Sequence, residues 1–258
     1  GDLDVFTLQT GSPDGGNRSG PEQLWLNDGR GGWQDVSDRV AFDVGDVHDH
    51  DFAAGDLNGD GLPDVVIVVD NLSASFQTAR NRLLLNRGGG RFEFAESPFD
   101  DFQGDWLHVE MVDVDADGDL DVVLPQDYLE GFSRAGTPAV ALFLNDGRGT
   151  FTPAHDRLHG MPRVPAFESV TTDVDGDGDP DMLIAVFGIL YSDGSIDPFR
   201  SVLLLNDGTA SFFEATAAFA DAATVASTDF GVADFDGDGD FDLIECAARG
   251  ESRYWSQE

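Results

Sequence analysis

The sequence has no lysine, and Cys246 is its single cysteine. All 14 basic residues are therefore arginine, against 50 aspartates and glutamates, which gives a formal net charge of −36. One cysteine excludes an intrachain disulfide, and the absence of lysine excludes Schiff-base chemistry. With no basic stripe to release counterions, neither nucleic-acid binding nor attachment to an anionic membrane is expected.

Long apolar runs and helical periodicity are also absent. The longest apolar run, 182–191, is about half the length that a membrane span needs, so direct membrane insertion is not expected. No signal peptide is visible. Short helical turns are expected only over 35–40 and 214–222.

What the sequence has in excess is aspartate at alternate positions. Residues 173–181 read Asp-Val-Asp-Gly-Asp-Gly-Asp-Pro-Asp, and an apolar run follows over 182–186. Carboxylates this close repel one another, so the segment resists folding unless a cation neutralises them. Oxygen ligands at positions 1, 3 and 5 with glycine at position 6 are typical of a Ca²⁺ loop. The competing interpretation is a solvated acidic turn.

Four copies of this motif occur in register, which favours the metal site. They begin at Asp56, Asp113, Asp173 and Asp234, with spacings of 57, 60 and 61 residues. Positions 1, 3, 5 and 9 are Asp or Asn in every copy, and position 7 is expected to bind through its backbone carbonyl. Asn58 offers a neutral oxygen, so the first loop should bind more weakly. About four Ca²⁺ ions are expected, with the ligands Asp56, Asn58, Asp60, Leu62, Asp64, Asp113, Asp115, Asp117, Asp119, Asp121, Asp173, Asp175, Asp177, Asp179, Asp181, Asp234, Asp236, Asp238, Asp240 and Asp242.

Other metal sites fit this motif less well. An EF-hand loop needs a bidentate Glu at position 12 and flanking helices, whereas only Glu245 of the last copy meets the first condition. An all-oxygen ligand set disfavours Zn²⁺, and the preference of Mg²⁺ for water disfavours a protein cage. The calcium is expected to be structural, because its binding energy becomes folding energy.

A second motif recurs with the same period. A Leu-x-Leu-Asn segment is followed by a glycine-containing turn and an aromatic segment, as in 142–151. The Asn-Asp-Gly stretch is interpreted as a hairpin turn, because these residues tolerate positive φ. Together with one strand on either side of the aspartate loop, this gives four expected strands per repeat.

Four short strands per repeat of about 60 residues predict an all-β fold, a β-propeller of four-stranded blades. We expect one domain over 1–258, with a partial blade at 1–43, complete blades at 44–101, 102–160 and 161–221, and a partial blade at 222–258. The two end pieces hold three strands each, whereas strand exchange that closes a ring needs four in total. The chain is therefore expected to be part of a larger propeller, and a closed five-bladed ring is the alternative.

The combined pattern, Asp-x-Asp-Gly-Asp-Gly-x-x-Asp followed by an apolar strand and Leu-x-Leu-Asn-Asp-Gly-x-Gly-x-Phe, covers essentially the whole chain. It resembles the FG-GAP/VCBS repeats of integrin-α-like β-propellers. The resemblance implies a seven-bladed propeller with Ca²⁺ between the first and second strands. It also implies a secreted, periplasmic or cell-surface location and a role in adhesion or in carbohydrate or protein binding. Ala116 and Asn58 depart from the repeat pattern.

The expected ligand surface lies opposite the calcium loops. The connections between second and third strands are long and unlike one another, at 10–22, 70–81, 125–139 and 188–200. Their aromatic and arginine side chains suit a carbohydrate or protein ligand. Ordinary loop packing is the alternative for each residue. The candidate ligand-binding residues are Tyr128, Phe132, Arg134, Tyr191, Phe199 and Arg200.

His108 raises the question of an enzyme. It aligns with Asp51, Glu168 and Asp229 in the repeats, and the four are expected to form a polar ring around a central tunnel. Neither Gly-x-Ser-x-Gly, His-Glu-x-x-His nor a phosphate loop is present. The main hypothesis is thus a calcium-stabilised binding or adhesion module with no catalytic residues. The alternative is a polysaccharide lyase or hydrolase that uses His108 or Glu168 with an arginine, or a non-catalytic module attached to one.

Overall fold

The computed structural model describes residues 2–8, 22–40, 49–69, 80–101, 106–126, 138–190, 196–197, 200–218, 226–249 and 252–255. Within these ranges the regular structure is almost entirely β-strand. The helical segments described are 3-10 turns of three or four residues, too short to cross a membrane.

Two of the repeats fold into four-stranded antiparallel sheets whose strands follow chain order. The first sheet consists of β4 (Asp49–Gly55), β5 (Asp64–Val69), β6 (Arg82–Asn86) and β7 (Phe92–Ala95). The second consists of β8 (Glu110–Val112), β9 (Asp121–Pro125), β10 (Val140–Asn145) and β11 (Phe151–Pro153). The aspartate loop and the turn after the asparagine lie at the same end of each sheet, because alternate connections of antiparallel strands in chain order return to the same end.

The third repeat differs from the expected four strands by having a fifth. Its own strands are β13 (Ala166–Thr172), β14 (Asp181–Val186), β17 (Val202–Asn206) and β18 (Phe212–Glu214). The added strand β12 (Leu158–His159) comes from the preceding repeat and pairs in parallel with β18. A small hairpin, β15 (Ile189–Leu190) with β16 (Ile196–Asp197), lies between β14 and β17.

The first and last sheets have three strands each, as predicted. They consist of β1 (Val5–Thr7), β2 (Gln23–Asn27) and β3 (Trp33–Asp35), and of β19 (Ala226–Ala233), β20 (Asp242–Arg249) and β21 (Arg253–Trp255).

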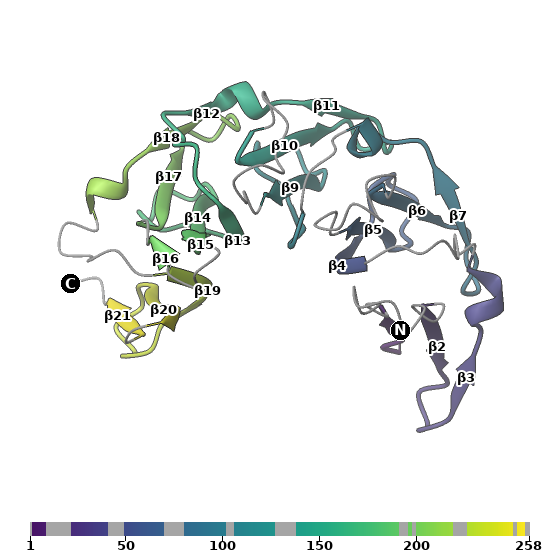
Figure 1. Cartoon of the computed structure of the whole chain (residues 1–258). Coiled ribbons are helices and arrows are strands. Elements are labelled where there is room, and N and C mark those ends of the chain that lie inside the picture. Colours follow the sequence, from purple (N-terminus) through teal and green to yellow (C-terminus); the bar gives the residue numbers. More distant parts are fainter. Residues whose placement is uncertain are drawn as a thin grey trace.

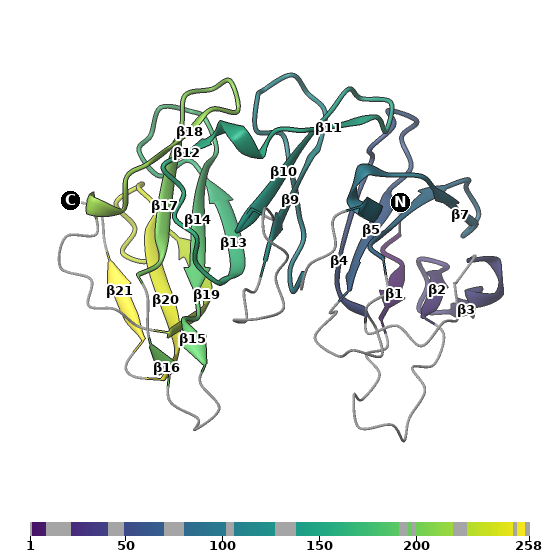
Figure 2. The ribbon, with the colours of Figure 1, turned by 45° about the horizontal axis from the view of Figure 1, so that its top comes forward.

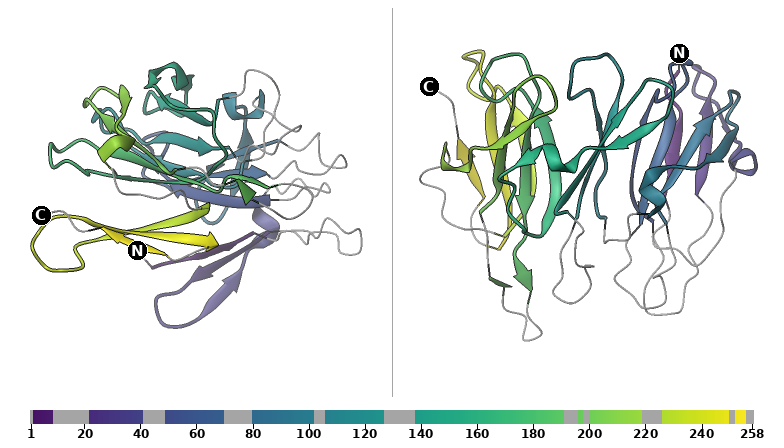
Figure 3. Two further views of the ribbon diagram at one scale, coloured as in Figure 1. Left: turned by 60° about the vertical axis from the view of Figure 1, so that its left-hand side comes forward. Right: turned by 90° about the horizontal axis from the view of Figure 1, so that it is seen from above.

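The five sheets stand along an arc, with β1–β3 and β19–β21 at its ends (Figure 1). Strands β4, β13 and β19 lie on the concave side, and β3, β7, β11 and β18 lie on the convex side. Figures 2 and 3 show from other directions that the sheets stand next to one another around the arc. The described residues form an arc and not a closed ring, so the number of blades stays a prediction.

Apolar side chains fill the space between consecutive sheets. All six residues of β5 are buried. Val66 and Val68 pack toward the β8–β11 sheet, whereas Val65 and Ile67 pack toward the β1–β3 sheet. An apolar run without alternation predicts such burial on both faces. Strands β9 and β14 are buried in the same way, so each sheet is held by its neighbours.

Short 3-10 turns after the fourth strands connect each sheet to the next. Two were predicted and are found as η1 (Ser37–Arg39) and η4 (Thr216–Ala218), whereas η2 (Pro98–Asp101) and η3 (His155–Arg157) were not predicted. Arg39 Nη1 donates to Gly89 O at 2.9 Å, and Arg157 Nη1 donates to Thr209 O at 2.7 Å. Each arginine thus reaches the hairpin turn of the following sheet.

Candidate metal centre

The ninth residue of each loop, here named the closing aspartate, begins the second strand and is buried. Asp64, Asp121 and Asp181 are each 0% exposed. In the first three loops, one carboxylate oxygen accepts the N–H of loop position 2, and the other accepts the N–H of the asparagine that ends the third strand. In the second loop, Val114 N lies 3.0 Å from Asp121 Oδ2 and Asn145 N lies 2.8 Å from Asp121 Oδ1. The closing aspartate therefore fastens the loop to its sheet.

The first aspartate of the loop turns the backbone around its own carboxylate. Asp56 accepts N–H groups from Gly59 at 2.8 Å and Gly61 at 2.7 Å. Both glycines have positive φ, 73° and 81°, which residues with a side chain rarely adopt. Ala116 replaces the first of these glycines in the second loop and still takes a φ of 58°, at a cost of about 1–2 kcal/mol.

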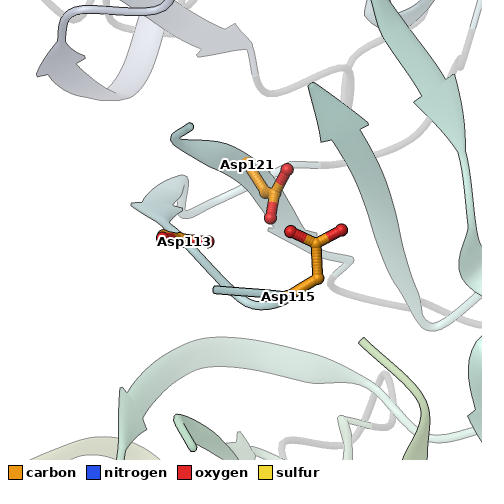
Figure 4. Close-up of side chains that lie close together, drawn as sticks. All are labelled: Asp113, Asp115 and Asp121. Atoms are coloured by element: carbon orange, nitrogen blue, oxygen red, sulfur yellow. The ribbon is translucent and has the colours of Figure 1, made fainter. Parts of the chain in front are cut away.

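The loops bring carboxylates from positions 1, 3 and 9 together. In each of the last three loops, one oxygen from each of these three residues lies within 4.8 Å of the others. Figure 4 shows the second loop, in which the carboxylates of Asp115 and Asp121 point toward each other beside Asp113. The three groups are Asp113, Asp115 and Asp121; Asp173, Asp175 and Asp181; and Asp234, Asp236 and Asp242.

The second loop carries acceptors that the protein itself does not satisfy. Asp113 Oδ1 and Asp115 Oδ1 are buried and have no hydrogen-bond partner. Burial, with the nearby charges of Asp115 and Asp117, raises the pKa of Asp121 to about 7. Burial and the charges of Asp117 and Asp113 also raise the pKa of Asp115. Buried oxygen acceptors with no donor fit a hard divalent cation such as Ca²⁺, which supplies the missing partner.

The predicted ligands at positions 5 and 7 lie outside these groups. The position 5 carboxylates accept the N–H of position 7, as from Asp119 N to Asp117 Oδ1 at 3.0 Å. The position 7 carboxylate of the second loop packs against Gly147 of the neighbouring turn, where an added Cβ would collide with it. The residues concerned are Asp60, Leu62, Asp117, Asp119, Asp177, Asp179, Asp238 and Asp240.

The first loop has the same backbone but a weaker ligand set. Asn58 stands where the other loops have their second carboxylate, and its Oδ1 accepts the N–H of Asp60 at 3.0 Å. Among the described residues, groups of three carboxylates occur in the last three loops only. The EF-hand alternative fails in the last loop as well, because Glu245 lies in β20 and accepts hydrogen bonds from Ser201 and Ser227.

The asparagine that ends the third strand has a role that the sequence did not indicate. Positive φ was predicted for the Asn-Asp-Gly turn, but in the described turns neither Asn nor Asp adopts it, and Gly does. Asn145 Nδ2 donates to Leu120 O at 3.0 Å and to Leu57 O, in the loop of the preceding sheet, at 2.9 Å. Asn206 Nδ2 likewise donates to Val114 O at 2.7 Å. The available signal was the recurrence of asparagine at this position in four successive repeats.

The polar residues predicted to line the centre do come together on the concave side. His108 Nδ1 lies 2.9 Å from Asp51 Oδ2, and Glu168 hydrogen-bonds with Asp229. Burial lowers the pKa of His108, but the hydrogen bond and charge of Asp51, with the charges of Glu168 and Glu110, raise it overall. Burial and the adjacent Asp229 raise the pKa of Glu168 to about 7, against the opposing charge of His108.

A buried ion cluster at the opposite end of the sheets was also missed from the sequence. Arg82 Nη2 lies 3.3 Å from Glu22 Oε1 and also contacts Asp49, and all three residues are buried. Burial and the hydrogen bond with Asp49 raise the pKa of Glu22 to about 7. The cluster joins the β4–β7 sheet to the β1–β3 sheet.

The candidate ligand residues can be placed only in part. Arg200 is exposed and lies two residues before the third strand of its repeat, β17. The other candidates lie outside the described residues: Tyr128, Phe132, Arg134, Tyr191 and Phe199.

Comparison with known proteins agrees with the repeat pattern. The family described as FG-GAP-like repeat matches residues 68–124 and 173–244, half of the chain. A comparison with curated proteins finds no match. Among solved structures, an Agrocybe aegerita lectin described as specifically recognising non-reducing terminal N-acetylglucosamine aligns with a TM-score of 0.56 and 20% identity. The alignment covers 94% of this chain but 60% of the lectin, so this chain spans less than two thirds of that protein. At this identity the likeness concerns the fold.

Proposed function

We propose that this chain, which belongs to the FG-GAP-like repeat family, is a calcium-stabilised β-propeller module that binds carbohydrate. The observation that carries the calcium assignment is the three-carboxylate group, with its buried unpartnered oxygens at Asp113 and Asp115. The carbohydrate assignment is supported by the likeness of fold to a lectin. The alternative for a binding module of this kind is a protein ligand, recognised in adhesion.

About four Ca²⁺ ions would bind, one in each loop. The carboxylates of positions 1, 3 and 9 would hold the ion, and position 5 with the backbone carbonyl of position 7 would complete the ligand set. The ions would neutralise repulsion that opposes folding and change the formal net charge from −36 to about −28. Asn58 gives the first loop the weakest of the four sites.

We extend the proposal to the architecture and the location. The five sheets would be blades of one propeller domain over 1–258, with partial blades at its ends, within the seven-bladed ring that the family resemblance implies. The location would be secreted, periplasmic or cell-surface. Free calcium outside the cytoplasm reaches the range in which extracellular modules bind it, about 10⁻⁴–10⁻³ M.

The ligand we favour is a neutral sugar. A strongly negative protein repels polyanions, so an uncharged glycan meets a lower electrostatic barrier than an acidic polysaccharide. The binding face would be the end of the sheets opposite the calcium loops, where the second strands end and the third strands begin. Arg200, exposed at that end, is the described residue best placed to contribute.

A glycan array probed with the calcium-loaded protein tests this function. Binding to neutral glycans is expected, with N-acetylglucosamine-terminated chains as the first candidates. Arg200→Ala should weaken the binding about fivefold or more, as truncation of an arginine anchor commonly does. Arg91→Ala is the matched control, an exposed arginine at the calcium end of a sheet, and should bind as wild type. A folded, calcium-loaded protein that binds none of the glycans would contradict the carbohydrate assignment.

The concave lining favours a second candidate function, an enzyme that acts on polysaccharides. Glu168, with its pKa raised to about 7, could act as a general acid, while Asp51 orients the imidazole of His108. Incubation with a panel of polysaccharides, followed by assay of new chain ends, separates this candidate from a binding module. Turnover that His108→Ala abolishes without lowering the melting temperature would favour the enzyme.

A further inference from the structure

The asparagines at the ends of β10 and β17 each contact two aspartate loops. Asn145 and Asn206 are buried, with 6% and 4% of their surface exposed. The backbone N–H of each donates to the closing aspartate of its own loop. The side-chain Nδ2 donates to a backbone carbonyl in the loop of the preceding sheet. Neighbouring loops are therefore joined through a single residue.

The carbonyls that accept these side-chain bonds lie inside the preceding loops. Leu57 and Val114 occupy position 2, between the first two metal-site residues, and both are 0% exposed. Their N–H groups donate to the closing aspartate of the same loop, at 3.1 Å for Asp64 and 3.0 Å for Asp121. The position 2 residue is thus held on one side by its own loop and on the other by the next sheet.

Taken together, these hydrogen bonds form one buried path through three loops. Breaking any of them would leave a buried polar group without a partner, which strongly disfavours independent movement of one loop. Each residue of the path is at most 6% exposed. In order, the path runs through Asp64, Leu57, Asn145, Asp121, Val114, Asn206 and Asp181.

We propose that this path couples calcium binding in loops 56–64, 113–121 and 173–181, so that the three ions bind cooperatively. The inference rests on the proposed function, because it needs calcium in these loops. An ion fixes the closing aspartate and the position 2 peptide group of its loop, and the asparagine passes this order to the adjacent loop. Coupling between sites typically changes affinity about 5–150-fold. Asn145 and Asn206 are positioning residues that act through the loops and do not touch the ions.

The chain contains an internal control for this coupling. Asn86 is the matching asparagine of the β4–β7 sheet, but its Nδ2 donates to Pro63 O of the same sheet, at 2.9 Å.

Calorimetric titration of the full chain with calcium alone tests the coupling. The wild-type isotherm should be steeper than independent sites allow. Asn145→Ala should reduce the Hill coefficient toward 1 while the number of ions bound at saturation is unchanged. The control Asn86→Ala removes a donor of the same kind within one sheet and should keep the wild-type steepness. An unchanged slope in Asn145→Ala, or an equal loss in both variants, would overturn the proposal.

Hydrogen exchange on the wild-type protein gives a second readout that does not depend on a variant folding. As calcium is added in steps, the N–H groups of Leu57, Val114 and Asn145 should gain protection together. Loops that gain protection one by one refute the coupling alone. Absence of both protection and binding heat refutes the calcium assignment itself, so the two failures are distinguishable.

Discussion

The aspartate loops and the concave lining are both acidic, but they neutralise charge by different means. In the second loop, Asp113 and Asp115 keep buried oxygens with no partner. On the concave side, Asp51 pairs with His108, and Glu168 shares a hydrogen bond with Asp229. Under the proposed function, the loops depend on a cation from solution, whereas the lining depends on protons and on an imidazole of the protein itself.

This difference shows that the density of acidic residues does not define a metal site. The lining has carboxylates from consecutive repeats, yet each is satisfied by a neighbouring side chain. The loops combine three oxygens within 4.8 Å with acceptors that nothing in the described protein satisfies. Unsatisfied buried acceptors, rather than net charge, identify the place for a cation.

Removal of calcium should lower the melting temperature more than a single substitution or a change of pH does. A smaller effect would contradict the contrast between the aspartate loops and the concave lining. Each site that is filled at a hundredfold excess over its Kd adds about 2.7 kcal/mol of stability. About 1 kcal/mol shifts the melting temperature of a chain of this size by roughly 2–4 °C, so a chelator should lower it by at least about 10 °C. Differential scanning calorimetry with calcium and with chelator measures this. An equal melting temperature in both would contradict a structural role for calcium.

Replacing one loop carboxylate should change the melting temperature by an intermediate amount. The sign of this change should depend on whether calcium is present. Asp175→Asn gives the third loop the residue that Asn58 supplies in the first. With calcium the variant loses a charged ligand and should melt about 2–5 °C lower, whereas in chelator it loses repulsion and should melt slightly higher. Melting temperatures in the two buffers check the reversal. Asn58→Asp is the reciprocal control and should shift in the opposite direction in each buffer.

Titration of the concave lining should change the melting temperature least, and this change should depend on pH. The folded-state pKa of Glu168 is raised from 4.5 to about 7. Protonated Glu168 therefore stabilises the folded protein fully below about pH 4.5, and this stabilisation is lost as pH rises through about 7. The pKa of His108 is raised above 6.5, so its contribution is also lost as pH rises. With saturating calcium, the melting temperature of wild type should fall between about pH 5 and pH 8.5.

Glu168→Gln should flatten this pH dependence, because glutamine keeps a donor toward Asp229 and does not ionise. The useful quantity is the difference between the variant and wild type at each pH, since calcium affinity itself rises with pH and acts in the opposite direction. Parallel curves for the two proteins would show that the pair does not titrate in this range.

Much of the architecture could be predicted from the order of the residues. The spacing of 57, 60 and 61 residues between aspartate loops placed one loop between two strands in each repeat, and the apolar run after it predicted a strand buried on both faces. The three-stranded sheets at the ends and the alignment of Asp51, His108, Glu168 and Asp229 followed from the same period. These features depend on local geometry and on repetition, both of which are written along the chain.

Other features depended on how the sheets stack. Asn145 and Leu57 are 88 residues apart, and nothing local indicates that the amide of one would meet the carbonyl of the other. Stacking likewise buried Arg82 with Glu22 and Asp49, and set β12 beside β18.

The sequence alone thus determined that the chain has repeated oxygen-rich loops at one end of small β-sheets, because a carboxylate at every second residue and a glycine turn need only neighbouring residues. The tertiary structure decided which of those carboxylates converge, which keep an unsatisfied oxygen, and which loops are joined to each other. Those outcomes depend on burial and on contacts between sheets, which arise only once the repeats have packed together.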